Sequence, residues 1–229
     1  GALMAYLVQP ADIELAVAWW RERADDGWVE AASDNIYSSG TAYTETRDEL
    51  DRVLLIARGE FARRAEDLLA GVITFAAWAL ITKAQIKIVH IVGAALAVGG
   101  FNVLRDAVQG KPAGPNTPSG GASILQKIGE AISREFKFFE RFAKQAQTGK
   151  NTPARAGMYA EAGRGTFEDV RGDVAKAAGK TEERRVLGVA DHCADCVAEA
   201  GKGWQPIGSL RAIGDSLCKT NCHCRFEYR

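Results

Sequence analysis

The sequence predicts a mainly α-helical protein whose long helices are followed by a small cysteine-rich C-terminal subdomain. Apolar residues recur every three or four positions over much of the first 147 residues, which is the period of an amphipathic helix. All five cysteines lie between positions 193 and 224, after 192 residues that contain none. No strand-rich region precedes the cysteines, so a sheet, in the form of a short β-hairpin, is expected only in the cysteine-rich subdomain.

The composition is that of an ordinary globular protein, with 47% hydrophobic and 25% charged residues. The formal net charge is zero, although residues 1–60 carry 12 acidic and 5 basic side chains and the remainder carries 17 and 24. No dense block of Lys and Arg predicts an arm that binds nucleic acid. The first residues lack the basic region and continuous apolar core of a secretory signal, so we expect synthesis in a reducing cytoplasm.

The first 71 residues predict two helices joined by a loop. In residues 10–28, Pro10 and the candidate cap Asp12 mark the start of a helix. Residues 29–42, with several Ser and Asn, predict a loop. Residues 44–71 predict the second helix, because its apolar side chains fall on one face. That face consists of Leu50, Leu54, Phe61, Ala65 and Leu68.

The stretch 69–101 is the most apolar part of the chain and predicts a central helix. A transmembrane helix needs about 18 or more consecutive apolar residues, and here lysines interrupt the run. Lys83, Lys87 and His90 fall at positions i, i+4 and i+7, so they share one face of a helix. Such a short polar stripe favours a helix packed among other helices, in a buried or oligomeric core. Two short apolar halves that form a hairpin in a membrane are the alternative.

A Pro- and Gly-rich linker at residues 110–122 divides the helical region into two parts. Residues 1–109 form the first part, around the apolar helix 69–101. Residues 123–186 form the second, in which an amphipathic helix is followed by short helices joined by glycines. The apolar stripe of the amphipathic helix predicts a contact, either with the helix before the linker or with a partner protein. The stripe consists of Leu125, Ile128, Ile132, Phe136, Phe139 and Phe142.

The C-terminal part, residues 187–229, has the cysteine spacing of a zinc site. A C-x-x-C pair is followed, after a 21-residue gap rich in turn residues, by a C-x3-C-x-C group. Two close-set groups of thiolates on a returning loop suit the tetrahedral coordination of a structural Zn²⁺. Since four ligands close such a site, one cysteine is spare. We predict Cys193, Cys196, Cys218 and Cys222 as the ligands, with Cys224 able to replace either of the last two.

Other roles for these residues stay open. His192 and His223 lie beside cysteines and are secondary candidates for metal binding. A redox C-x-x-C pair normally opens a helix in a thioredoxin-like unit, and no such βαβ pattern precedes this one. Disulfides would suit an exported particle, although five cysteines leave one unpaired. A catalytic zinc site would use a water and a carboxylate, for which Asp191, Asp195 and Asp215 are close in sequence.

Catalysis is nevertheless not the expected role of the protein. Thiolate-rich zinc sites are usually closed to substrate. The sequence has no nucleophile–base pairing, no phosphate-binding loop and no carboxylate pair in a known catalytic setting. We therefore expect a structural metal, no catalytic residue, and a protein that is not an enzyme.

The cysteine pattern resembles that of a known family. Asp191 with Cys193 and Cys196 is followed by a Gly- and Pro-containing loop and then by Asn221, Cys222 and Cys224. This arrangement resembles the C-terminal part of bacteriophage head morphogenesis proteins, the minor head (minor capsid) proteins similar to the F protein of phage Mu. The resemblance covers about residues 155–229. The family often has "HPNC" where this chain has "KTNC", so Cys218 would supply the ligand in place of the usual His.

The resemblance implies a structural minor virion protein of a tailed bacteriophage. Such a protein is made in the host cytoplasm, lies at the portal vertex of the head, and acts in head assembly, DNA packaging or ejection. It implies contacts with portal or capsid proteins in an oligomeric assembly, with DNA nearby but no sequence-specific binding.

Two further functions stay open from the residues themselves. One is a membrane-active ejection protein, in which residues 69–101 contact the host membrane. The other is a zinc-ribbon protein that binds nucleic acid. For the second, the available basic and aromatic residues are Lys202, Trp204, Arg211, Lys219, Arg225 and Arg229.

Overall fold

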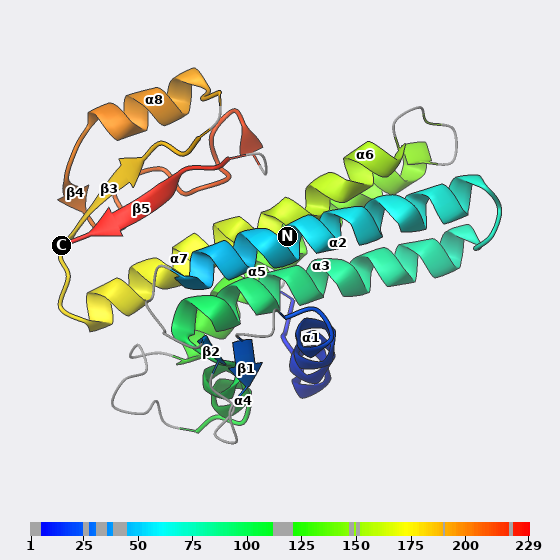
Figure 1. Cartoon of the computed structure of the whole chain (residues 1–229), viewed down its shortest axis with the longest axis horizontal. Helices are drawn as coiled ribbons and strands as arrows, with labels where there is room; N and C mark the ends of the chain where they lie inside the picture. The colour runs from blue at the N-terminus through cyan, green and yellow to red at the C-terminus, as the bar shows by residue number, and fades with distance from the viewer. Residues whose placement is uncertain are drawn as a thin grey trace, which may run out of the picture.

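The computed structural model describes residues 6–24, 28–30, 36–38, 45–111, 121–146, 149, 152–189, 191–219 and 222–229, and it is mainly helical, as the sequence predicts (Figure 1). In chain order the elements are α1 (Pro10–Arg21), β1 (Trp28–Glu30), β2 (Ile36–Ser38), α2 (Glu45–Leu69), α3 (Phe75–Val98), α4 (Phe101–Val108), α5 (Gly121–Ala146), α6 (Thr152–Gly157), the 3₁₀ turn η1 (Met158–Glu161), α7 (Ala162–Ala177), β3 (Glu182–Val186), α8 (Ala194–Gly201), β4 (Gln205–Pro206) and β5 (Arg225–Tyr228). The elements from α1 to α7 form an elongated helical body. The elements from β3 onward form the C-terminal subdomain, which lies beside α7 at one end of that body (Figure 1).

The central helix α3 is shorter than the predicted helix over 69–101, because local signals fix both of its ends. The side chain of Thr74 accepts a hydrogen bond from the backbone N–H of Ala77 (3.2 Å) and caps the start. Gly99, with φ of 87°, adopts the left-handed conformation that ends the helix. The residues between α2 and α3 form a turn in which Gly71 also has a positive φ. Residues 69–101 are therefore the end of α2, a turn, α3 and the start of α4.

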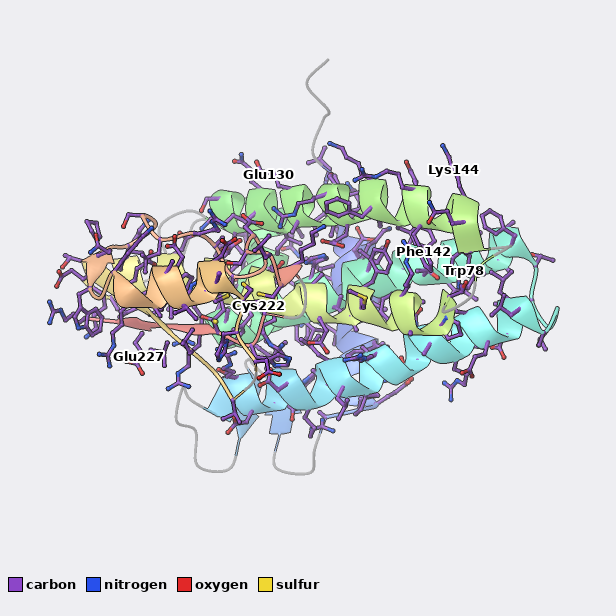
Figure 2. All side chains as sticks on the ribbon, turned by 90° about the horizontal axis from the view of Figure 1, so that it is seen from above. Trp78, Glu130, Phe142, Lys144, Cys222 and Glu227 are labelled. Carbon is purple, nitrogen blue, oxygen red and sulfur yellow. The ribbon has the colours of Figure 1, made fainter. Side chains whose placement is uncertain are left out.

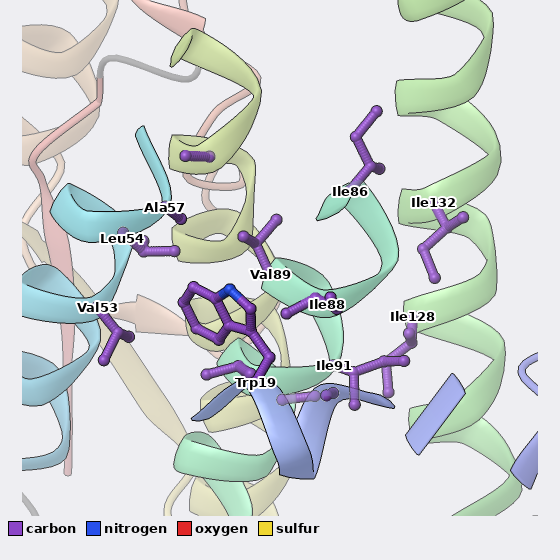
Figure 3. Packing of buried hydrophobic residues seen from close by; sticks show 14 of the residues in the cluster. Trp19, Val53, Leu54, Ala57, Ile86, Ile88, Val89, Ile91, Ile128 and Ile132 are labelled. Carbon is purple, nitrogen blue, oxygen red and sulfur yellow. The ribbon is translucent and has the colours of Figure 1, made fainter. Parts of the chain in front are cut away.

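One hydrophobic core holds the helical body together. Its buried residues come from both sides of the predicted linker, among them Leu54 of α2, Val89 and Ile91 of α3, and Ile128 and Ile132 of α5 (Figure 3). The linker therefore does not separate two cores, although residues 112–120 of it lie outside the described residues. The stripe predicted for α5 packs against α3, so of the two predicted contacts the structure contains the one within the chain.

The polar residues that share one face of α3 form ion pairs and a hydrogen bond with other helices of the body. Lys83 forms an ion pair with Glu140 of α5 (3.1 Å), and Lys87 forms one with Asp12 of α1 (3.0 Å). The Nδ1 of buried His90 lies 2.6 Å from Thr166 Oγ1 of α7. Among the described residues α3 is the one helix long and apolar enough to cross a membrane, yet 67% of its most apolar window is buried in the body. The prediction of a helix packed among other helices is confirmed.

Helices α3 and α7 approach each other closely because each contributes a glycine where they cross. A Cβ atom on Gly163 would lie 2.6 Å from the carbonyl oxygen of Val89, and one on Gly93 would lie 2.5 Å from that of Gly163. Real Cβ atoms do not come so close to backbone, so only glycine allows this crossing. One side of α7 thereby packs against α3, and another side contacts β5 of the C-terminal subdomain.

Three local predictions need correction. The loop expected at 29–42 contains the last two residues of β1 and all of β2, which pair as antiparallel strands. The short helices expected up to residue 186 include the 16-residue α7 and the strand β3. Asp12 is not the cap residue of α1: Gln9 takes that position, and Asp12 accepts a hydrogen bond from the Gln9 N–H (3.0 Å) from inside the first turn.

The C-terminal subdomain contains a three-stranded antiparallel sheet of order β4-β3-β5, where a short hairpin was expected. Its principal pair is β3 with β5, in which Glu183 lies opposite Tyr228 and Val186 opposite Arg225. Helix α8 and all the cysteines lie between these two strands in sequence. The subdomain therefore begins at Glu182, before the predicted boundary at 187, and the sheet holds both ends of the cysteine-bearing segment.

Candidate metal centre

The C-x-x-C pair occupies the first turn of α8. Cys193 is the N-cap residue, with extended backbone (φ −69°, ψ 158°), and Cys196 is the third residue of the helix. This spacing places both side chains at the same end of α8. Asp195 lies between them and helps to fix the returning loop, because its carboxylate accepts hydrogen bonds from the Arg211 guanidinium (2.5 Å) and the Leu217 N–H (3.2 Å).

The second cysteine group lies on a tight turn that leads into β5. The turn reverses at Lys219, which has a positive φ of 46° and accepts a hydrogen bond from the Cys222 N–H (3.1 Å). Cys218 lies before this reversal, and Cys222 and Cys224 lie after it. Asn221, which belongs to the pattern of the family resemblance, is outside the described residues.

The five thiols form two triangles that share one corner. The Sγ atoms of Cys193, Cys196 and Cys218 all lie within 4.8 Å of one another, and so do those of Cys196, Cys222 and Cys224. The distance from Cys196 Sγ is 3.5 Å to Cys218 Sγ and 3.7 Å to Cys222 Sγ. With Zn–S bonds of about 2.3 Å, the edge of a tetrahedron of sulfurs is about 3.8 Å. These cysteines could therefore hold a metal ion.

The same distances are not those of disulfides. A disulfide has an S–S bond of about 2.05 Å, and all five cysteines are free thiols in the structure. Cys196, Cys222 and Cys224 are buried and form part of the small apolar core of the subdomain, with Leu210, Ile213 and Phe226. Three thiols thus stand where a larger domain would place aliphatic side chains.

A buried arginine faces the thiols. Arg185 of β3 is 2% exposed, and its Nη1 donates hydrogen bonds toward Cys196 Sγ (3.4 Å) and Ser216 Oγ (3.1 Å). Its other terminal nitrogen donates to the carbonyl oxygen of Arg211. Within the described part of the chain no carboxylate forms an ion pair with Arg185. A buried positive charge of this kind favours the thiolate forms that bind metal.

The two histidines beside the cysteines point in different directions. His192 Nδ1 lies 3.8 Å from Cys224 Sγ, and its Nε2 lies 2.7 Å from the carbonyl oxygen of Gly188. His223 is exposed, and its Nδ1 lies 3.3 Å from Nη1 of Arg164 in α7. Of this pair, His192 lies beside Cys224 but belongs to neither triangle of thiols, and His223 faces the helical body.

A buried ion pair attaches the cysteine cluster to the helical body. Glu168 of α7 is completely buried and binds Arg47 of α2, with a distance of 2.5 Å between Oε1 and Nη1. The second oxygen of Glu168 accepts a hydrogen bond from the Phe226 N–H (3.3 Å), and Arg47 donates to the carbonyl oxygen of Cys224 (3.1 Å). Burial raises the pKa of Glu168, which Arg47 and Arg171 lower again. The cysteine turn is thus bound to two helices of the body. Figure 2 shows Cys222 toward the end that carries α8, away from Trp78 and Phe142.

A cavity of about 420 Å³ lies between α5, the η1–α7 segment and the cysteine loop. Cys222 forms part of its wall, together with Arg134, Glu135, Tyr159 and Arg164. Burial raises the pKa of Glu135 to about 7, and Arg134 lowers it in part. The cavity therefore contains a carboxyl group that titrates near neutral pH.

The sequence identified the cysteines but not their surroundings. All five are brought together, and the structure gives no reason to set Cys224 apart as the spare one, since it belongs to the fully buried triangle. Arg185 and Glu168 were missed, because an isolated Arg in a charged stretch and a Glu in a helix look like surface residues. The carboxylates considered for catalysis are not gathered there: Asp195 is bound by Arg211, and Asp191 and Asp215 are exposed.

Comparisons of the chain with protein-family models, with curated proteins and with solved structures gave no match.

Proposed function

We propose that the protein is a structural minor component of a tailed-bacteriophage virion. It would lie at the portal vertex of the head, bound to portal or capsid proteins, and act in head assembly, DNA packaging or ejection. The observation that supports this proposal is the gathering of all five cysteines at one site, because these residues carry the resemblance to phage minor head proteins.

The metal in this proposal is a structural Zn²⁺. Buried thiolates at tetrahedral spacing suit zinc, and a site closed by cysteines leaves no open position for substrate. The apolar core of the subdomain is small, so its folding would depend on the free energy of metal binding. The bound ion would make the subdomain a rigid contact surface, and the protein would act by contact and not by catalysis.

The proposal is tested by locating the protein during phage assembly. Quantitative mass spectrometry of purified proheads and virions should find it in both, at a small and constant ratio to the major capsid protein. Removal of its gene should leave heads that are malformed, that lack DNA or that do not infect. Absence of the protein from proheads and virions alike would overturn the proposal.

One observation favours a membrane-active ejection protein as a second candidate. At the end of the body away from the cysteines (Figure 1), three apolar side chains are exposed: Leu69 at the end of α2 (49%), Val72 in the turn that follows (70%) and Leu80 in the second turn of α3 (72%). The burial of α3 in the core argues against insertion of the whole helix. Leakage of dye from vesicles on addition of the protein would support this candidate, and a protein that neither floats with vesicles nor permeabilises them would exclude it.

A nucleic-acid-binding role receives less support, because the basic residues of the subdomain are engaged within the chain. Arg211 pairs with Asp195, Arg225 with Glu227, Arg229 with Glu182, and Lys202 with Glu199. Trp204 is covered by the guanidinium groups of Arg184 and Arg229, at 4.8 and 4.5 Å from the ring centre. Few of these cations remain to neutralise phosphates.

A further inference from the structure

We propose that the cavity beside the cysteine loop is a binding site for a small aromatic carboxylic acid. The ring of the ligand would lie against the apolar wall of the cavity, and its carboxylate would face the cations that line it. The volume of about 420 Å³ is within the range of small-molecule sites in proteins. This inference goes beyond the role in the phage head and does not depend on it.

Part of the wall is apolar and aromatic. Phe138 of α5 and Met158 and Tyr159 of η1 line the cavity. The ring of Tyr159 is held by Phe139 and Phe142, whose ring centres lie 5.9 and 5.8 Å from it. Aromatic rings and a thioether both pack favourably against a flat aromatic ligand. The other apolar side chains of the wall are Ala162 and Ile213.

Cations outnumber acids among the exposed residues that line the cavity. In the described part of the chain these residues are the cations Arg134, Arg155 and Lys219 and the acid Asp215. Arg155 donates a hydrogen bond to Gln145 Oε1 (3.1 Å). Arg134 and Lys219 form no hydrogen bond or ion pair with any described residue. Two positive charges at the cavity are therefore available to a carboxylate.

A buried acid in the wall also lacks a partner. Glu135 is 7% exposed, and it forms no hydrogen bond or ion pair with any described residue. Burial raises its pKa to about 7, so near neutral pH many chains carry a protonated carboxyl that can donate a hydrogen bond. Arg164 and Glu161, which also line the cavity, pair with each other (3.0 Å). Because an unpaired buried polar group is costly, a ligand that accepts from Glu135 would stabilise the folded chain.

These features together select the chemistry of the ligand. An inorganic anion would pair with the cations but leave the apolar wall in contact with water. An uncharged aromatic molecule would cover the wall but leave the cations without a counter-ion, and an aromatic amine would be repelled by them. An aromatic carboxylate satisfies the wall, the cations and the protonated carboxyl at once.

Titration calorimetry of the full-length chain with 2-naphthoate at pH 7.5 tests the proposal. We expect one saturable site per chain with a Kd of about 1 mM or below. The matched probes are 2-naphthamide, which is uncharged, and naphthalen-2-ylmethanamine, which is cationic. Each should bind about 10-fold more weakly or worse, because the attraction to two cations is lost. No saturable binding of 2-naphthoate, or equal binding of the amide, would overturn the proposal.

Substitutions locate the bound probe. Arg134→Gln and Lys219→Gln should each weaken the binding of 2-naphthoate by about 5-fold. Glu135→Gln should tighten it by about 4-fold, because at pH 7.5 only about a quarter of the parent chains carry the protonated carboxyl, whereas glutamine always offers a donor. A cationic ligand would show the opposite response to all three changes.

Lys137→Gln is the matched control, because Lys137 is exposed on the same helix as Arg134 and does not line the cavity. This variant should bind 2-naphthoate as the parent does, and thermal unfolding should show that every variant is folded. Equal binding by the parent and by the double variant Arg134→Gln/Lys219→Gln would place the probe elsewhere on the molecule and overturn the proposal.

Discussion

Glu135 illustrates how one buried side chain can set the pH dependence of stability. Its side chain lines the cavity beside the cysteine loop, and burial raises its pKa from 4.5 to about 7. Between these two values the folded state binds more protons at this position than the unfolded state does. The free energy of unfolding therefore falls as the pH rises from about 4.5 to above 7.

We predict that Glu135→Gln removes this dependence. The variant should be more stable than the parent at pH 8, by about 2 kcal/mol, and close to the parent at pH 5. Urea denaturation at the two pH values measures the difference. Asp169, whose pKa burial raises to about 6, should leave a smaller slope of the same sign. Glu130→Gln, at an exposed position of the same helix, is the control, and an equal gain there would refute the assignment to Glu135.

At the level of the helices, the close crossing of α3 and α7 makes a sharp prediction about glycine. Gly163→Ala places a Cβ atom 2.6 Å from the Val89 carbonyl oxygen and 3.1 Å from Leu54 Cδ2, so the two helices must move apart. We expect a loss of about 1–3 kcal/mol in the free energy of unfolding.

Gly59→Ala is the matched control for this prediction. Gly59 lies inside α2, and a Cβ atom there meets nothing within 4 Å. The same substitution should stabilise the protein at this position by about 0.5–1 kcal/mol, because alanine favours the helix. Thermal unfolding of both variants measures the contrast. If both changed stability in the same direction, the crossing at Gly163 would not be as tight as described.

Most helices could be predicted from the sequence because their apolar faces repeat at the helical period. The face of α5 that includes Ile128, Ile132 and Phe139 is an example, and all three are buried. The strand β3 could not be predicted in this way, since its buried positions are Glu183 and Arg185 and not apolar residues. Only tertiary partners make these charges compatible with burial: Glu183 accepts from the Gly208 and Leu210 N–H groups, and Arg185 faces the thiols.

The candidate site likewise has one part that the sequence predicted and one part that depends on tertiary contacts. Cysteine spacing alone predicted that the thiols meet, because each close-set group can reach one ion. Which thiols are buried, and which histidine lies beside Cys224, depends on the contact of Gly188 with the His223 backbone. No local pattern in the sequence encodes a contact between segments that are 35 positions apart.

For the whole molecule, the separation of the two cores predicts that the C-terminal subdomain can unfold on loss of metal while the helical body stays folded. The core of the helical body contains no cysteine, whereas cysteines make up much of the core of the C-terminal subdomain. Removal of the metal by a chelator should therefore unfold residues 182–229 and leave α2, α3, α5 and α7 folded.

Hydrogen exchange followed by mass spectrometry measures this separation. After chelation, amide protection should disappear from β3, α8 and β5 and should persist in α3. Addition of zinc should restore it. Equal loss of protection in both parts would mean that the subdomain and the body unfold as one unit, and unchanged protection of the subdomain would mean that metal does not contribute to its fold.

The place of β5 after the cysteines has a consequence for the order of events during synthesis. Helix α7 ends at Ala177, before the first cysteine, so the helical body can fold before any thiol leaves the ribosome. At about 5–20 residues per second, translation from Cys193 to Tyr228 takes roughly 2–7 s. During that interval the thiols are exposed, and β3 has no β5 to pair with. The zinc available to the growing chain in those seconds, and not the folding of the helices, would then limit how many chains reach the native state.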